Sequence, residues 1–170
     1  LKKDDELHWA HRTRGNDEII IVTRDAQSIR FSEKDVRAMG RQAAGVIAMR
    51  LGKNDEIVGS DVIDRAHKAA QEKLLVIMEQ GYGKQTLLSQ YKRQRRGGSG
   101  IKTSKTTPKT GKAVDARIVH ADEEEIIAIS KKGQVIRTQL AAIPTLGRQT
   151  QGVRIMRMDE GDSVASITTL

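Results

Sequence analysis

The segment LLVIMEQGYGKQT, residues 74–86, decides the fold, because it occurs three times in altered form along the chain. It consists of an apolar run, a polar turn and a second short run, which is the pattern of a β-hairpin. The same pattern occurs in IIIVTRDAQSIRF (19–31) and IIAISKKGQVIRT (126–138), at offsets of 55 and 52 residues. Repeats of this size with several short strands are typical of propeller-like blades. We therefore predict an all-β protein that contains three repeated blades of about four strands each.

Two further features of each repeat keep the same register. The first is a turn-like segment, found as MGRQAAGV (39–46), QRRGGSGI (94–101) and LGRQTQGV (146–153). The second is a final strand-like segment, found as NDEIVGSDVI (54–63), GKAVDARIV (111–119) and GDSVASITTL (161–170). LKKDDEL (1–7) matches LGKNDEI (51–57), so we expect the chain to begin on the final strand of a preceding blade and to belong to a larger array. The predicted division is a closing strand at 1–15 and blades at 16–66, 67–121 and 122–170.

The first run of each hairpin is apolar at consecutive positions, at residues 19–22, 74–77 and 126–129. A strand of this kind hides both of its faces, so we expect it to lie between neighbouring blades. FSEKDVRAM (31–39) has two possible structures, a helix capped by Ser32 or a short turn. Register with the other repeats favours the turn.

Charge points to a polyanionic partner. The chain has 30 Lys and Arg against 22 Asp and Glu, a formal net charge of +8. The excess is local, because residues 81–120 hold ten basic residues and one acid, Asp115. We expect a partner to meet this segment.

Several basic residues recur with the repeat. Arg41, Arg96 and Arg148 are equivalent, as are Arg30 and Arg137, and Lys102 and Arg154. Equivalent positions of repeats form a stripe on the surface, and a stripe of cations can follow a phosphate backbone. In YKRQRRGGSGIKTSK (91–105), glycines allow a turn that presents backbone N–H groups to an anion, although a plain surface turn is the alternative. The predicted DNA-contacting residues are Lys92, Arg93, Gln94, Arg95, Arg96, Gly97, Gly98, Ser99, Gly100, Lys102 and Lys105, with the recurring Arg30, Arg41, Arg137, Arg148 and Arg154.

The sequence favours duplex DNA and contains no signature of catalysis. Aromatic residues make up 2% of the chain, too few for a platform that stacks single-stranded bases. The four histidines are scattered and there is no cysteine, so we predict neither a metal site nor a disulfide. No phosphate loop or nucleophile motif is present, and no active site is expected within these residues. The lack of a long apolar run or signal peptide predicts an intracellular protein.

With the repeats and the basic glycine turn established, the chain resembles the family of C-terminal domains of DNA gyrase A. The residues that carry the resemblance are GNDEIIIVTRDAQSIRFSEKDVRAMGRQAAGV, QGYGKQTLLSQYKRQRRGGSGIK and GQVIRTQLAAIPTLGRQTQGVRIMRM. The resemblance implies a β-pinwheel, a propeller-like fold in which strands pass between neighbouring blades and which normally has about six of them. By resemblance, the chain corresponds to the last three blades and the closing strand of the one before.

The family also has a signature box, Q-[KR]-R-G-G-[KR]-G, on its first blade. Residues 94–100 match its pattern except that Ser99 replaces the basic sixth residue, and their blade corresponds to the fifth. The segment is therefore interpreted as a sequence similar to the box on a different blade, and not as the box itself.

The resemblance implies that the domain wraps DNA for a type II topoisomerase that introduces negative supercoils. ATP and Mg²⁺ are implied for the whole enzyme and no cofactor for this chain. The implied partners are double-stranded DNA, the rest of gyrase A, and gyrase B in an A2B2 assembly, in the bacterial cytoplasm at the nucleoid. Two alternatives stay open: the C-terminal domain of the related A-type protein of topoisomerase IV, and a propeller-like scaffold that binds proteins.

Overall fold

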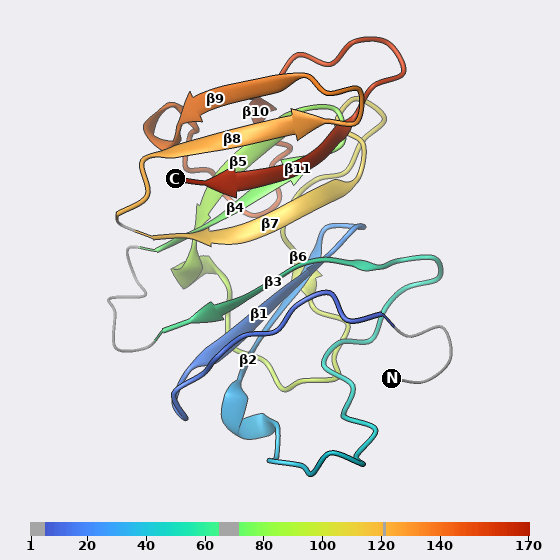
Figure 1. Cartoon of the computed structure of the whole chain (residues 1–170), viewed down its shortest axis with the longest axis vertical. Coiled ribbons are helices and arrows are strands. Elements are labelled where there is room, and N and C mark those ends of the chain that lie inside the picture. The colour runs from blue at the N-terminus through green and yellow to red at the C-terminus, as the bar shows by residue number, and fades with distance from the viewer. Residues whose placement is uncertain (1–5, 65–71, 121) are drawn as a thin grey trace.

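The computed structural model describes residues 6–64, 72–120 and 122–170, which form three antiparallel sheets (Figure 1). The first sheet has the order β3 (Ile57–Ile63), β1 (Glu18–Thr23), β2 (Gln27–Ser32), β6 (Ile101–Lys102). The second has the order β10 (Val153–Arg154), β5 (Tyr82–Leu87), β4 (Lys73–Met78), β7 (Ala113–Val119). The third has the order β11 (Val164–Thr169), β8 (Glu125–Ser130), β9 (Val135–Gln139). The prediction of an all-β protein is confirmed.

Each of the three repeated segments forms the expected hairpin, made of β1 and β2, β4 and β5, or β8 and β9. A single 3-10 turn follows each hairpin, at η1 (Glu33–Asp35), η2 (Leu88–Gln90) and η3 (Leu140–Ala142). In the first of these turns, the Ser32 side chain accepts a hydrogen bond from the Lys34 N–H. The short turn expected at this place is therefore confirmed, and Ser32 caps it.

The consecutive apolar residues of β4 are buried on both faces, as expected. Leu74, Val76 and Met78 pack with side chains of β1 in the first blade, whereas Leu75 and Ile77 pack with side chains of β8 in the third. These five side chains are at most 1% exposed. The central strand thus provides apolar surface to two interfaces between blades, and burial of such surface is the main favourable term in folding.

The sheets are linked by an exchange of short strands. β6 follows the second hairpin in sequence but pairs with β2 of the first, with Ile101 opposite Ser28. β10 follows the third hairpin and pairs with β5 of the second, with Val153 opposite Gly83. Strands therefore pass between neighbouring blades, as the resemblance implied.

The innermost strands of the blades lie side by side. β3 contacts β7, and β7 contacts β11, as Figure 1 shows. The Ile118 N–H donates to the Asp61 carboxylate at 2.8 Å and thereby joins β7 to β3. The predicted closing strand at 1–15 falls partly on residues outside the described ranges, and residues 6–15 contain no strand. This assignment and the blade boundaries at 66/67 and 121, which also fall at residues not described, stay predictions.

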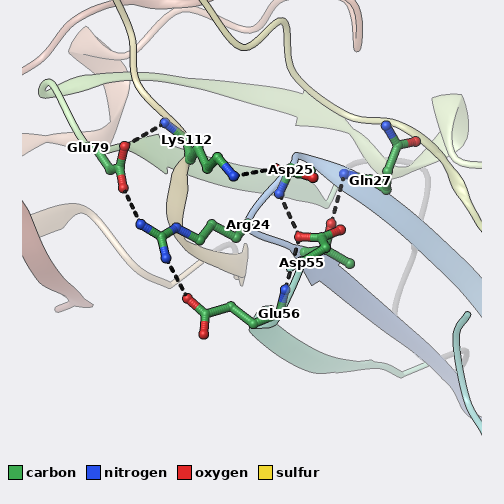
Figure 2. Close-up of polar contacts among 8 residues, drawn as sticks. Arg24, Asp25, Gln27, Asp55, Glu56, Glu79 and Lys112 are labelled. Carbon is green, nitrogen blue, oxygen red and sulfur yellow. Dashed lines mark hydrogen bonds and ion pairs between the residues drawn. The ribbon is translucent and has the colours of Figure 1, made fainter. Parts of the chain in front are cut away.

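A network of ion pairs joins the first two blades at the ends of their hairpins (Figure 2). The Arg24 guanidinium lies 3.0 Å from both Glu56 and Glu79, and the Lys112 ammonium lies 3.0 Å from Asp25. Glu79 also accepts the Lys112 N–H at 2.8 Å. Burial raises the pKa of Glu79, but the Lys112 N–H and Arg24 outweigh it and keep the pKa below its ordinary value. Arg24 and Glu79 occupy equivalent positions of the first and second repeats. Their opposite charges attract each other and so favour contact between the first and second blades.

The tight crossing of β6 leads to a test at Gly100. Its φ is +79°, and a methyl group on it would lie 2.5 Å from the Ser28 carbonyl oxygen. Gly100→Ala should lower the free energy of unfolding by about 2–4 kcal/mol, because it adds a steric clash to an unfavourable backbone conformation. Gly45 occupies the equivalent position in the first repeat with φ +80° and no atom within 4 Å of the added methyl group. Gly45→Ala should lower the free energy of unfolding by only about 1 kcal/mol. Urea titration of both variants measures the difference. Equal losses would show that the crossing is not tight.

Candidate nucleic-acid interface

The basic segment 91–105 has a defined path, because its backbone is attached to the first blade. The Gln94 N–H donates to the Arg30 carbonyl and the Gly97 N–H to the Ala48 carbonyl, each at 2.7 Å. The Arg50 N–H donates to the Gly98 carbonyl at 2.9 Å. Beyond this turn the chain continues into β6. The segment is therefore a shaped turn between two blades.

The equivalent arginines of the second and third repeats share a structural role. Arg96 donates from Nε to the Asp35 carbonyl and from Nη1 to the Ile47 carbonyl, both at 2.9 Å. Arg148 donates from Nη1 to the Lys102 carbonyl at 2.7 Å. Each guanidinium thus joins its turn to backbone contributed by the neighbouring repeat.

Arg30 and Arg137 are also engaged within the fold. Arg30 is paired with Glu18 at 2.6 Å, donates to the Leu88 carbonyl at 2.8 Å, and has a side chain that is 16% exposed. Arg137, at the equivalent position, is exposed but forms an ion pair with Glu125. Carboxylates therefore neutralise both cations, which sequence reasoning had placed in the stripe.

A second group of the predicted residues is exposed and has no side-chain hydrogen bond or ion pair within the described ranges. Its cations are Lys92, Arg93, Arg95, Lys102, Lys105 and Arg41. Ser99 is exposed, and Gly97, Gly98 and Gly100 are half-buried backbone of the turn. Gln94 is half-buried, and its Nε2 is a buried atom without a partner. Five of these six cations lie in segment 91–105.

The surface continues between the second and third blades around Tyr82. Arg154 donates to the Tyr82 hydroxyl at 3.2 Å, and the Lys109 ammonium lies 5.4 Å from the centre of its ring. The hydrogen bond from Arg154 lowers the pKa of Tyr82 below its ordinary value. Sequence reasoning missed Lys109 and Tyr82, although the local count of basic residues included Lys109. The sequence showed the positive charge of Lys109, but its cation–π contact with Tyr82 depends on the fold.

A cavity of about 270 Å³ lies at the inner strands and has a different character. Its lining includes Asp61 and Asp115 as well as Arg117, so it combines both signs of charge. Burial raises the pKa of Asp115, and Arg117 opposes that shift. Such a lining does not suit a polyanion.

Other chemistry is not indicated by the described residues. Tyr91 is 2% exposed and hydrogen-bonds Thr103 through its hydroxyl, as expected for a core residue. In the described part of the chain, no group of three or more His, Cys, Asp or Glu side chains is arranged to hold a metal ion. Nor does any helix there have the length and apolar character needed to span a membrane.

Comparisons with known proteins agree with the fold. The family model described as DNA gyrase C-terminal domain, beta-propeller, matches residues 17–64, 72–120 and 124–170. DNA gyrase A of Staphylococcus epidermidis (strain ATCC 12228 / FDA PCI 1200) is 40% identical over 167 residues, covering 98% of this chain and 18% of the relative. The corresponding protein of Staphylococcus aureus (strain MRSA252) is 39% identical with the same coverage. The chain thus spans about a fifth of the length of these relatives.

Solved structures show the same likeness. A structure of a DNA gyrase A C-terminal domain is 28% identical, with a TM-score of 0.79, and the match covers 91% of this chain and 50% of that one. The C-terminal domain of a DNA topoisomerase IV is similar in fold, with a TM-score of 0.89 at 23% identity, over 100% of this chain and 51% of that one. The sequence resemblance to the gyrase domain is thereby confirmed: the chain belongs to the DNA gyrase C-terminal domain family.

Proposed function

We propose that the chain binds duplex DNA without sequence specificity and bends it, as part of the C-terminal domain of a gyrase A protein. The observation that carries the proposal is the group of exposed cations, without a side-chain partner in the described structure, on a turn whose backbone is fixed to the first blade. A fixed turn loses little conformational entropy on binding, so its charges are available to phosphates at low cost.

The proposed surface runs over both strand exchanges. Segment 91–105 includes β6 on the first sheet. On the second sheet Arg148 precedes β10 and Arg154 lies in it, and Figure 1 shows these strands on successive blades. Contacts from successive blades suit a duplex that follows the surface. Bending a duplex of about 20–30 base pairs costs on the order of 1–6 kcal/mol, which several phosphate contacts can offset.

Duplex DNA fits these residues better than single-stranded DNA does. Phe31 and Tyr91 are 2% exposed, and the Tyr82 ring lies between two cations. These three rings are therefore not free to stack on successive bases, and of the Phe, Tyr and Trp side chains among the described residues only that of Trp9 is exposed. The 40% identity to a gyrase A protein favours gyrase over topoisomerase IV, whose likeness to this chain is one of fold.

In the proposed enzyme, the chain supports ATP-dependent negative supercoiling by the whole assembly. The proposed protein partners are the rest of gyrase A, and gyrase B in an A2B2 assembly, with ATP and Mg²⁺ acting outside these residues. A bacterial cytoplasmic site at the nucleoid follows from this role. The alternative function of a different class is a protein-binding scaffold. A scaffold differs from a DNA-binding domain in that its affinity for its partners depends little on salt.

The first test is duplex affinity across a salt series. We expect log K to fall with log salt with a slope of about −3 to −5, as for roughly three to six neutralised phosphates. Changing both Arg93 and Arg95 to Ala should flatten the slope by about two, since two phosphate contacts are lost.

The control changes Lys53 and Lys131 to Ala, because both are exposed lysines that neither lie in segment 91–105 nor adjoin a residue bonded to it. It should alter the slope by much less. Equal changes in the two double variants would indicate diffuse attraction to net charge, and a flat wild-type slope would favour the scaffold.

A second test separates the two neighbouring arginines of the turn. Arg96→Ala removes two hydrogen bonds to backbone carbonyls and should lower the free energy of unfolding by about 1–3 kcal/mol. Arg95→Ala, at an exposed side chain without a partner in the described structure, should stay within about 0.5 kcal/mol of wild type. Urea unfolding midpoints measure both. Identical stabilities would contradict the structural role of Arg96.

A further inference from the structure

A lysine lies buried beneath the turn of the third repeat. The Lys84 side chain on β5 is 1% exposed. Its ammonium donates to the carbonyls of Gly147 and Arg148, each at 2.6 Å, and to the Thr150 hydroxyl at 3.1 Å. An ammonium has three N–H groups, so these three oxygens satisfy all of them.

The turn held by Lys84 also fixes the basic segment of the second repeat. The Thr150 carbonyl accepts the Lys105 N–H at 3.0 Å and the Ser104 hydroxyl at 3.2 Å. Arg148 donates to the Lys102 carbonyl at 2.7 Å. Three cations of the proposed surface, Lys102, Lys105 and Arg148, are therefore connected through one turn that rests on Lys84.

The other repeats fill the equivalent position without a charge. At the repeat offsets of 55 and 52 residues, Lys84 corresponds to Ile29 and Ile136. Ile29 lies beneath the equivalent turn, where a methyl group on Gly98 would be 3.6 Å from its Cδ1. An isoleucine thus fills the space beneath the turn of the second repeat, whereas the turn of the third repeat is bonded to an ammonium.

We propose that Lys84 is a positioning residue for the DNA-binding surface: its ammonium holds residues 147–150 in the conformation that presents Arg148, Lys102 and Lys105 to phosphates, and bound DNA in turn stabilises the charged ammonium. The inference rests on the proposed function. Phosphates that contact Arg148 neutralise its charge, which removes a repulsion on Lys84. Linkage then requires that DNA binding and protonation of Lys84 strengthen each other.

The titration of Lys84 lies within an accessible range. Burial, together with the nearby charge of Arg148, lowers the pKa of Lys84 from 10.5 to about 8. The charged groups on the neighbouring elements are Lys73 on β4, Arg154 on β10, and Lys102 and Lys105 of the basic segment. Two tyrosines are also close: Tyr82, whose pKa the hydrogen bond from Arg154 lowers, and Tyr91, whose pKa burial raises. At pH 8 about half of the free chains carry a neutral Lys84. Formation of each complex should therefore be accompanied by uptake of at most about half a proton.

Fold stability should respond to pH in the opposite direction. The pKa of Lys84 is lower in the folded chain than the unfolded value of 10.5. The unfolded chain therefore binds more protons between about pH 8 and 10.5, and the contribution of Lys84 to stability rises with pH over that window. DNA affinity should fall over the lower part of the same window, so loss of fold cannot explain it.

The experiment is calorimetry of duplex binding at pH 8 in two buffers with different ionisation enthalpies, which measures proton uptake. Wild type should take up about 0.3–0.5 proton, and its affinity should fall roughly three- to tenfold from pH 7 to pH 9. Lys84→Ile, which carries the side chain of the equivalent positions, and Lys84→Arg, which stays charged, should both lose this uptake. Lys53→Met removes one charge outside the surface and should keep it.

The outcomes separate this inference from the function on which it rests. Binding by wild type without proton uptake, or uptake that persists in Lys84→Ile, overturns the role of Lys84 and leaves DNA binding intact. A wild-type chain that binds no duplex at low salt overturns both proposals. A Lys84→Ile variant that is less stable but keeps the wild-type proton uptake shows a merely structural lysine.

Discussion

The transfer of a short strand from the second and the third repeat to the sheet of the repeat before it is the constraint on which the rest of the structure depends. β6 and β10 are two residues long, yet each completes a sheet whose other strands come from elsewhere in the sequence. The crossing requires close backbone approach, which Gly100 and Gly152 allow at positive φ, with added methyl groups only 2.5 and 2.4 Å from carbonyl oxygens. Because the blades share strands, their interfaces cannot rearrange independently.

The same crossing explains why the recurring cations divide into two groups. A turn that passes between sheets has carbonyls that need donors, and arginine supplies forked N–H groups to them. Arg96 and Arg148 serve this purpose, and Arg30 links β2 to backbone carbonyls of the second repeat. Other recurring cations, such as Arg41 and Lys102, have no such carbonyl partner among the described residues and remain exposed. Recurrence in sequence therefore marks structural and ligand-facing cations alike.

Sequence reasoning reached the parts of the fold that depend on local pattern. The hairpins, the burial of residues 74–77 and the turn at Ser32 follow from hydrophobic runs, repeat register and capping. That strands pass between neighbouring blades came from the family resemblance. The pairing of β6 with β2 was not predicted, because two residues contain too little pattern to identify a partner. The role of Arg96 and the burial of Lys84 were missed, since each depends on which carbonyls the tertiary structure brings within reach. The residues that contact DNA and the blade boundaries stay predictions.

Hydrogen exchange of the chain with and without a linear duplex tests the central claim most directly, that DNA lies across the strand-exchange turns. The account predicts slower exchange for amides of residues 92–105 and 147–154 on binding, with β3 unchanged. Amides in surface turns generally exchange through local opening of the chain. Slower exchange of the amides in these turns therefore reports contact with DNA or local stabilisation more than a change in global stability. Protection concentrated on the inner strands β3, β7 and β11, with the turns unaffected, would contradict the account.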